Sequence, residues 1–205
     1  GEPDAYVSSD VIRKIAKRWW GSELAADFST YEGKALAAKM IQDRQYAKES
    51  LILCDFAWPI TDSAHTGDHL GDPTLESQVY SALTGRDVDE RGLYEIGERA
   101  FNVQRAVQAR EGHLGRQSDT LREVFFTTPL KTEFANPECL APGKGGEPMS
   151  KKGWVVDREK FEQMKTEYYQ YRGWDPETGL QTKSKLGQLG LDEIAEGLVK
   201  YKAVV

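Results

Sequence analysis

The first residues that could do chemistry are an acid and a thiol at the end of a helix-forming segment. Glu49 lies near its end, and Cys54 follows after the apolar run Leu51–Leu53. A thiolate can bind iron, but a lone cysteine in an apolar run is more often a small buried side chain. One thiol is also a single ligand, whereas an iron–sulfur cluster takes about four. The residues alone therefore favour a buried, inert Cys54.

Two histidines form a second candidate group in the segment from Asp62 to Pro73. His65 and His69 are four positions apart, which on a helix would place both rings on one face for a divalent metal. The turn-forming run Thr66–Asp68 between them argues against a helix. We therefore predict that this loop lines an entrance for a partner or substrate rather than a metal site. His113, after Gly112, is expected to cap a helix end.

A third candidate is a series of arginines spaced along one helix-forming segment and the loop after it: Arg99, Arg105, Arg110 and Arg116. Such a series could pair with phosphate groups. The alternative is a solvated helix face on which Glu98 and Glu111 neutralise the arginines. The residues alone favour the solvated face.

Composition narrows the class of protein. The 205 residues carry 27 basic and 33 acidic side chains, a net charge of −6, and lack the clustered cations of nucleic-acid-binding proteins. Apolar runs are far shorter than the roughly 20 residues of a membrane-spanning helix, and no signal peptide is recognisable at the start. The two cysteines, Cys54 and Cys139, do not make a disulfide framework, which suits a reducing, cytoplasmic location.

Helix signals dominate the elements that must position these residues. Capping residues, terminal glycines and apolar spacing predict helices over 10–20, 34–50, 89–112 and 157–173 and from 192 onward, the second preceded by the capping-box pattern Ser29–Glu32. Strand-like runs are limited to 124–126 and 154–156, and residues 62–73 and 127–153 are expected to be loops. We predict an all-α fold of irregular helical domains with long loops, divided into 1–126 and 127–205.

Three stretches in this order resemble one protein family: Gln42–Phe56, Glu98–Leu121 and Tyr168–Leu191. They are similar to the C-terminal helical region of the tungsten-containing aldehyde ferredoxin oxidoreductases. The resemblance also extends to divergent members of the family, such as the tungsten subunit of a benzoyl-coenzyme A reductase. In the family the first stretch contains the pattern Asp-x-x-Gly-Leu-Cys. This sequence has Glu49 for the aspartate and Ile52 for the glycine, which is expected to alter the turn.

The resemblance implies cofactors and site residues. Members hold tungsten, or molybdenum, between two molybdopterins beside a 4Fe-4S cluster. By register, Cys54 would be one cluster ligand, and Glu49 and Leu53 would lie on the pterin side, within an apolar wall that includes Phe56 and Trp58. Trp174 is expected to be a packing anchor.

The resemblance also implies partners. The N-terminal remainder of such an enzyme, with its other cluster ligands and catalytic acids, would complete the site. Ferredoxin or another electron-transfer subunit and a small aldehyde or carboxylate would be the further partners, with a homo-oligomer as an open alternative. We expect no catalytic residue in these 205 residues and no activity from them alone. The competing hypothesis is a non-catalytic helical interaction module derived from the family.

Overall fold

The computed structural model describes residues 8–54, 61, 63 and 66–205. This part of the chain is mostly helical, which confirms the predicted all-α class. The α-helices are α1 (Ser9–Trp20), α2 (Lys34–Ser50), α3 (Leu75–Thr84), α4 (Glu90–Arg110), α5 (Val124–Thr127), α6 (Arg158–Arg172), α7 (Lys183–Gln188) and α8 (Asp192–Val199). Short 3-10 helices lie at Glu23–Ala26, Gly115–Gln117 and Lys144–Gly146.

Local capping explains where several helices begin. The side chains of Ser8, Asp89 and Asp157 each accept a hydrogen bond from a backbone N–H in the first turn of α1, α4 and α6. The capping box expected before α2 is wrong. Gly33 precedes that helix without a side-chain cap, and Ser29 instead donates its hydroxyl to Asp27.

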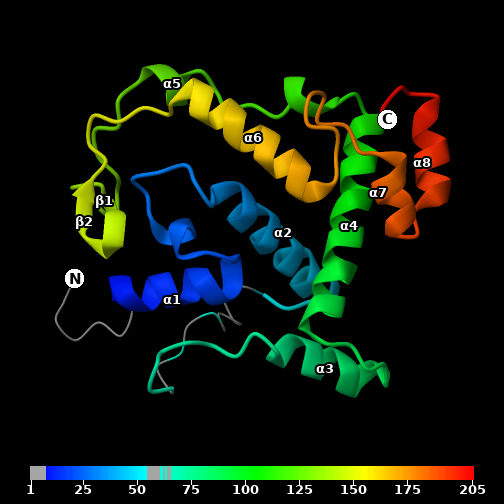
Figure 1. Cartoon of the computed structure of the whole chain (residues 1–205), viewed down its shortest axis with the longest axis horizontal. Helices are drawn as coiled ribbons and strands as arrows, with labels where there is room; N and C mark the ends of the chain where they lie inside the picture. The colour runs from blue at the N-terminus through cyan, green and yellow to red at the C-terminus, as the bar shows by residue number, and fades with distance from the viewer. Residues whose placement is uncertain (1–7, 55–60, 62, 64–65) are drawn as a thin grey trace.

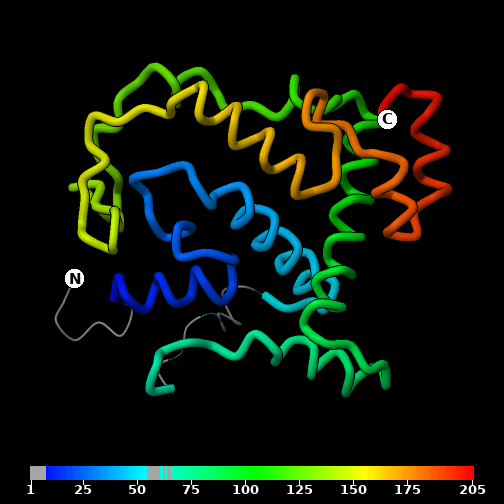
Figure 2. Tube along the Cα trace, viewed as in Figure 1, coloured from blue at the N-terminus to red at the C-terminus, as the bar shows by residue number. Residues whose placement is uncertain are grey.

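The helices form layers around α2 and α4. Helix α2 lies between α1 and α6, and α4 runs across the ends of this layer (Figure 1). Helices α7 and α8 pack together on the other side of α4, and the C-terminus lies beside them (Figure 2). Helix α3 contacts α4 near the chain reversal at Gly85. No helix in the described part of the chain is long and apolar enough to cross a membrane.

Small side chains fill much of the apolar core. One cluster joins α4 to the C-terminal helices through Ala106, Ala109, Leu186, Leu191, Ala195, Leu198 and Ala203. A second cluster joins α1, the following 3-10 helix and α2 through Ala16, Ala25, Ala26 and Ala37. Alanine permits close helix packing, and between α2, α4 and α6 the space holds charged side chains as well.

Neither of the two strand-like runs forms a strand. Residues 124–127 form the short helix α5, and residues 154–156 lie outside any strand. The strands β1 (Leu140–Pro142) and β2 (Pro148–Ser150) pair antiparallel inside the segment expected to be a loop. Each has only three residues and ends or begins with proline, so neither carries an alternating pattern that sequence reasoning could detect.

Contacts cross the predicted boundary between residues 126 and 127. Helix α6 packs on α2, α8 packs on α4, and the ring of Phe126 lies edge-on to that of Phe161. The division into two domains at this point stays a prediction.

Candidate functional site

The candidate site is the chain reversal at the C-terminal end of α2. The N–H of Leu53 donates to the carbonyl of Lys48 at 3.0 Å, and the N–H of Ile52 donates to that of Glu49 at 3.0 Å. This pair of bonds defines a Schellman helix end, whose central residue must be left-handed. Ile52 is that residue, with φ of +59°. Ile52 thus takes a left-handed conformation at the position where the family pattern has glycine, and the expectation that it alters the turn stays a prediction.

The reversal presents its side chains to solvent. Glu49 and Cys54 are exposed, Leu53 is half-buried, and Ile52 is 92% exposed. The inference of a buried Cys54 from the residues alone is thus wrong, whereas Cys139 is buried. The apolar run misled because the left-handed cap turns it outward at the helix end. Phe56 and Trp58 of the expected apolar wall lie outside the described residues.

The reversal offers a metal one exposed thiol, that of Cys54. Among the described residues, no group of three or more His, Cys, Asp or Glu side chains could hold a metal ion. In the part of the chain that the structure describes, Gln45 Nε2 makes the side-chain hydrogen bond to Glu49, 3.2 Å from its Oε1. The donor set fits a contribution of one thiolate and one carboxylate to a group held mainly elsewhere, and does not fit a complete cluster site.

A buried charged network fixes α2 against α6. The guanidinium of Arg172, fully buried, pairs with the Asp43 carboxylate and donates to Gln42 Oε1 at 2.7 Å. Asp43 also pairs with Lys39 Nζ at 2.6 Å. The Arg172 guanidinium lies 4.2 Å from the ring centre of Phe101 on α4. These contacts anchor the helix that carries Glu49 and Cys54.

The same network continues to α4 and α7 through one buried acid. Glu98 lies 2.9 Å from Lys185 Nζ and 3.5 Å from Lys39 Nζ. Burial acts to raise the pKa of Glu98, but the ion pair with Lys185 and the charge of Lys39 outweigh it and hold the pKa below its usual value. Glu98 is therefore a structural anion inside the fold.

The arginine series divides into two kinds: Arg105 and Arg116 make internal ion pairs, whereas Arg99 and Arg110 are exposed. Arg105 makes a bidentate pair with Asp119 at 2.8 and 2.5 Å, and the Tyr169 hydroxyl donates to the same carboxylate at 2.7 Å. Arg116 Nη1 bonds Glu162 at 2.7 Å. Only Arg110 has the surface pairing predicted, with Glu111 at 3.2 Å. Arg99 donates instead to the Leu189 carbonyl at 3.1 Å.

Trp174 is a packing anchor, as predicted. It is 3% exposed, and its indole N–H donates to Asn102 Oδ1 at 2.9 Å. Gln181 Nε2 donates to the same oxygen at 2.8 Å. The two later motif stretches thus meet in the interior, where α4 contacts the chain after α6. Their residues hold the fold that presents the α2 reversal.

The comparison with protein families agrees with this arrangement. The family model described as "Aldehyde ferredoxin oxidoreductase, domains 2 & 3" matches residues 5–191. The chain belongs to the aldehyde ferredoxin oxidoreductase family. It corresponds to domains 2 and 3 of such an oxidoreductase, whose complete members bind a metal pterin and a 4Fe-4S cluster.

The structure describes only one histidine of the pair His65 and His69, so it does not show whether the two rings lie together. His65 lies outside the described residues, and His69 has φ of +59° with its Nδ1 3.2 Å from the Ser63 carbonyl oxygen. The prediction that this loop lines an entrance stays open to test. His113 is exposed, and its backbone N–H, bonded to the Gln108 carbonyl at 3.0 Å, closes the end of α4.

Sequence reasoning missed the residues that position the site. Asp43 and Arg172 stand 129 positions apart, so no local pattern pairs them. Gly97, a buried glycine of α4, also positions the site. A Cβ there would lie 2.0 Å from the Asp43 carbonyl oxygen, so this glycine sets the distance between α2 and α4. The sequence offers no signal for Asp43, because it stands between Gln42 and Arg44, where a charged side chain is expected on the surface.

Proposed function

We propose that this chain is the C-terminal helical region of an oxidoreductase that holds tungsten or molybdenum between two molybdopterins beside a 4Fe-4S cluster. The whole enzyme would interconvert aldehydes and carboxylates with ferredoxin-type electron transfer. Family membership supports the reaction class. When bound, the metal pterin supplies the redox chemistry, and the cluster carries electrons to or from it.

The chain's own contribution is the reversal after α2. The Cys54 thiolate would hold one iron, and the Glu49 carboxylate would accept N–H groups of the pterin, with Leu53 between them in the motif. Glutamate reaches about one methylene further than the family aspartate, so its carboxylate sits further from the backbone. The exposure of Cys54 and Glu49 supports these roles, because a ligand to a group held elsewhere must be reachable from outside this chain.

The observation that carries the proposal is the left-handed Ile52. It occupies the family's glycine position with φ of +59°, and its side chain is 92% exposed. An isoleucine in that conformation is disfavoured by about 1–2 kcal/mol and gains no packing here. The turn is therefore retained against local preference, which supports a requirement for the turn itself.

The remainder of the enzyme would supply what these residues do not. We expect the three other cluster ligands, most pterin contacts and the catalytic groups to come from an N-terminal part. The 205 residues alone are therefore expected to be inactive. Ferredoxin or another electron-transfer subunit is the proposed redox partner, and a homo-oligomer stays open.

The test replaces each cysteine in the whole protein that carries this chain. Cys54→Ser exchanges a soft thiolate for a harder oxygen, so the cluster should be lost or its potential strongly shifted. Cys139→Ser is the matched control, since the Cys139 thiol is buried beside the hairpin and donates to the Pro137 carbonyl at 3.9 Å. Iron content and the electron paramagnetic resonance of the reduced cluster are the measurements.

Two outcomes would contradict the proposal. A Cys54→Ser protein that keeps its iron, cluster potential and turnover would remove Cys54 from the ligand set. A whole protein that binds neither iron nor tungsten nor molybdenum would favour the alternative, a non-catalytic interaction module. Metal analysis by mass spectrometry separates these two results.

A further inference from the structure

An apolar groove of about 830 Å³ lies at the opposite end of α2 from Cys54. Its walls come from the segment before α2, from α5 and the chain after it, from the chain after β2, and from α6. The larger apolar side chains that line it are Phe28, Tyr31, Phe125, Leu130, Trp154 and Met164. At least three of them are substantially exposed, with 46% for Phe28, 51% for Phe125 and 43% for Trp154. Such a patch is unusual on a free surface and marks a binding site.

The charged side chains lining the groove all have the same sign. They are Lys34, Lys131 and Lys151, and no acidic residue in the described part of the chain lines it, although the whole chain has a net charge of −6. The Lys151 ammonium lies 3.4 Å from the ring centre of Trp154, and no carboxylate of the described residues is within salt-bridge distance of it. Burial lowers the pKa of Lys151, only partly opposed by the charge of Asp27. A bound anion would oppose this effect, because a nearby negative charge favours the charged form of the lysine.

Lys34 adds a second positive charge to the lining of the groove. Its ammonium donates to the backbone carbonyls of Leu24 and Asp27, the latter at 2.7 Å, and no side-chain carboxylate of the described residues pairs with it. Its charge is therefore solvated by peptide oxygens, and the nearby Asp27 carboxylate acts on it only through space. The nearby Asp27 carboxylate is engaged by Ser29, through its N–H at 2.8 Å and its hydroxyl at 2.6 Å.

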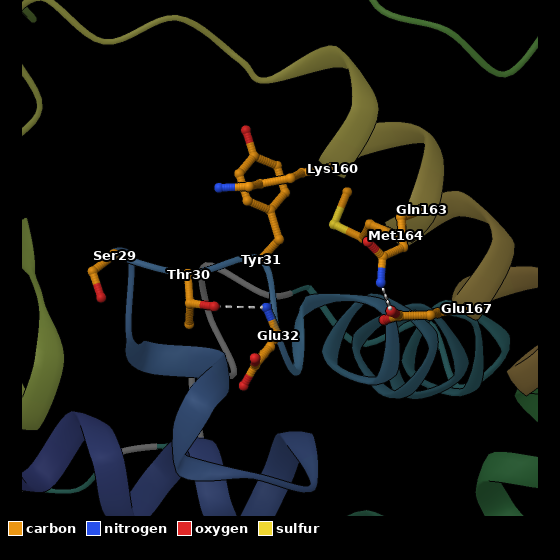
Figure 3. Close-up of a pocket in the computed structure, with 8 residues that line it drawn as sticks. All are labelled: Ser29, Thr30, Tyr31, Glu32, Lys160, Gln163, Met164 and Glu167. Carbon is orange, nitrogen blue, oxygen red and sulfur yellow. Dashed lines mark hydrogen bonds between the residues drawn. The ribbon is translucent and has the colours of Figure 1, made fainter.

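A smaller polar cleft adjoins the groove, and the two share Ser29, Thr30, Tyr31 and Met164. Figure 3 shows Tyr31 beside Lys160, with Gln163 and Glu167 on α6 further along the cleft. The Tyr31 hydroxyl accepts a hydrogen bond from the Asp157 N–H at 2.9 Å, which fixes the ring as a wall. The groove thus has aromatic sides, of which Tyr31 is held in place, and its polar extension lies beyond Tyr31.

The groove is remote from the proposed cofactor end. Lys34 begins the 17-residue helix α2, and Cys54 follows its end. A helix of that length spans about 25 Å at 1.5 Å per residue. A molecule in the groove therefore does not occupy the site proposed at the Cys54 end.

We propose that this groove binds a small apolar carboxylate, an aromatic or medium-chain acid, with its carboxylate at Lys151 and its apolar part along Trp154 and Phe125. The apolar walls select a hydrophobic body, and the lysines select a negative charge. A planar ring also suits Trp154, whose indole forms one side of the groove.

In the experiment, the whole purified protein is titrated with 2-naphthoate and, separately, with its neutral analogue 2-naphthamide. Isothermal titration calorimetry measures the binding of each. Saturable binding of one naphthoate per chain is expected, with naphthamide weaker by about tenfold or more, as for loss of a charge-assisted contact. Lys151→Met should weaken naphthoate by about tenfold and leave naphthamide unchanged, and Lys151→Arg should restore most of the affinity. Lys152→Met is the matched control, because Lys152 pairs with Glu138 at 2.7 Å outside the groove.

Any of three results would overturn the proposal. Equal binding of naphthoate and naphthamide, or an unchanged affinity in Lys151→Met, would remove the charge recognition. Absence of saturable binding in the whole protein would show that another part of the protein, or another macromolecule, occupies the groove. The Cys54→Ser protein should bind naphthoate normally, so this test fails independently of the cofactor assignment.

Discussion

Arg172 and Asp43 form an ion pair that is shielded from solvent and joins the end of α6 to the middle of α2. The Arg172 side chain has no exposed surface, and that of Asp43 is 6% exposed. Two charges removed from water stabilise a fold only when each is well paired, and here Gln42 and Lys39 complete the pairing. The proposed iron ligand therefore depends on a helix whose position is set by buried charge.

The first prediction concerns the two sides of this pair. Arg172→Met should lower the free energy of unfolding by about 3–5 kcal/mol, as for breaking a buried pair. Asp43→Leu should lower the free energy of unfolding more than Arg172→Met does. In Arg172→Met the Asp43 carboxylate keeps its ion pair with Lys39. In Asp43→Leu the buried Arg172 loses its only carboxylate partner among the described residues. Urea denaturation of both variants gives the comparison. Losses below about 1 kcal/mol would show that the pair is not structural, and equal losses would show that Lys39 does not compensate Asp43 when Arg172 is removed.

The second prediction concerns the close approach of α2 and α4. Gly97→Ala would place its Cβ 2.0 Å from the Asp43 carbonyl oxygen, so the helices must separate. We expect a loss of about 1–3 kcal/mol or more in the free energy of unfolding. Gly197→Ala is the matched control: a Cβ there meets nothing within 4 Å, and alanine should stabilise α8 by about 0.5–1 kcal/mol. A neutral Gly97→Ala would mean that the helices do not pack this closely.

The helices that carry local signals could be predicted from the sequence. Asp89 and Asp157 cap α4 and α6, and Gly173 ends α6 with φ of +67°. Helices α3 and α7 were not predicted. Helix α7 has only six residues, one of them glycine, and α3 follows a proline-containing turn without a side-chain cap. Short elements of this kind take their stability from packing on α4 and α8 rather than from propensity.

The candidate site could be predicted only as a motif. The resemblance placed Cys54, Glu49 and Leu53 together, but local pattern gave the wrong exposure for Cys54. Exposure depended on the left-handed residue that reverses the chain, and no sequence rule expects isoleucine there. The ion pair of Arg105 could not be predicted from the sequence, because its partner Asp119 lies 14 residues away on a loop with no periodic pattern.

The third prediction concerns pH. Because the pKa of Glu98 is lower in the folded chain than its usual value of 4.5, its ionised form stabilises the fold. That contribution is complete above the unfolded-state value and is lost as pH falls through the lower folded-state pKa. Glu98→Gln should therefore destabilise most near neutral pH, and its deficit should shrink on acidification. Glu95→Gln is the control, since Glu95 pairs with Arg91 at 3.1 Å on the surface. Unfolding followed from about pH 7 to about pH 3 tests this, and a pH-independent deficit would contradict it.

The last prediction compares two helix ends of the same kind. Helix α4 ends as α2 does, with Gly112 at φ of +99° where α2 has Ile52. A Cβ at Gly112 meets nothing within 4 Å, so both positions report backbone conformation with little packing.

Ile52→Gly should raise the free energy of unfolding by about 0.5–1 kcal/mol, because relief of the left-handed strain exceeds the extra freedom glycine gives the unfolded chain. Gly112→Ile should lower it by a similar amount, and Ile52→Ala should gain less than Ile52→Gly because it keeps the Cβ. Thermal or urea unfolding measures all three. The whole protein adds a second readout: iron content should be unchanged in Ile52→Gly, since glycine favours the same turn that presents Cys54. Destabilisation by Ile52→Gly would mean that the exposed side chain contacts another part of the whole protein, and that this contact, rather than the turn, explains the isoleucine.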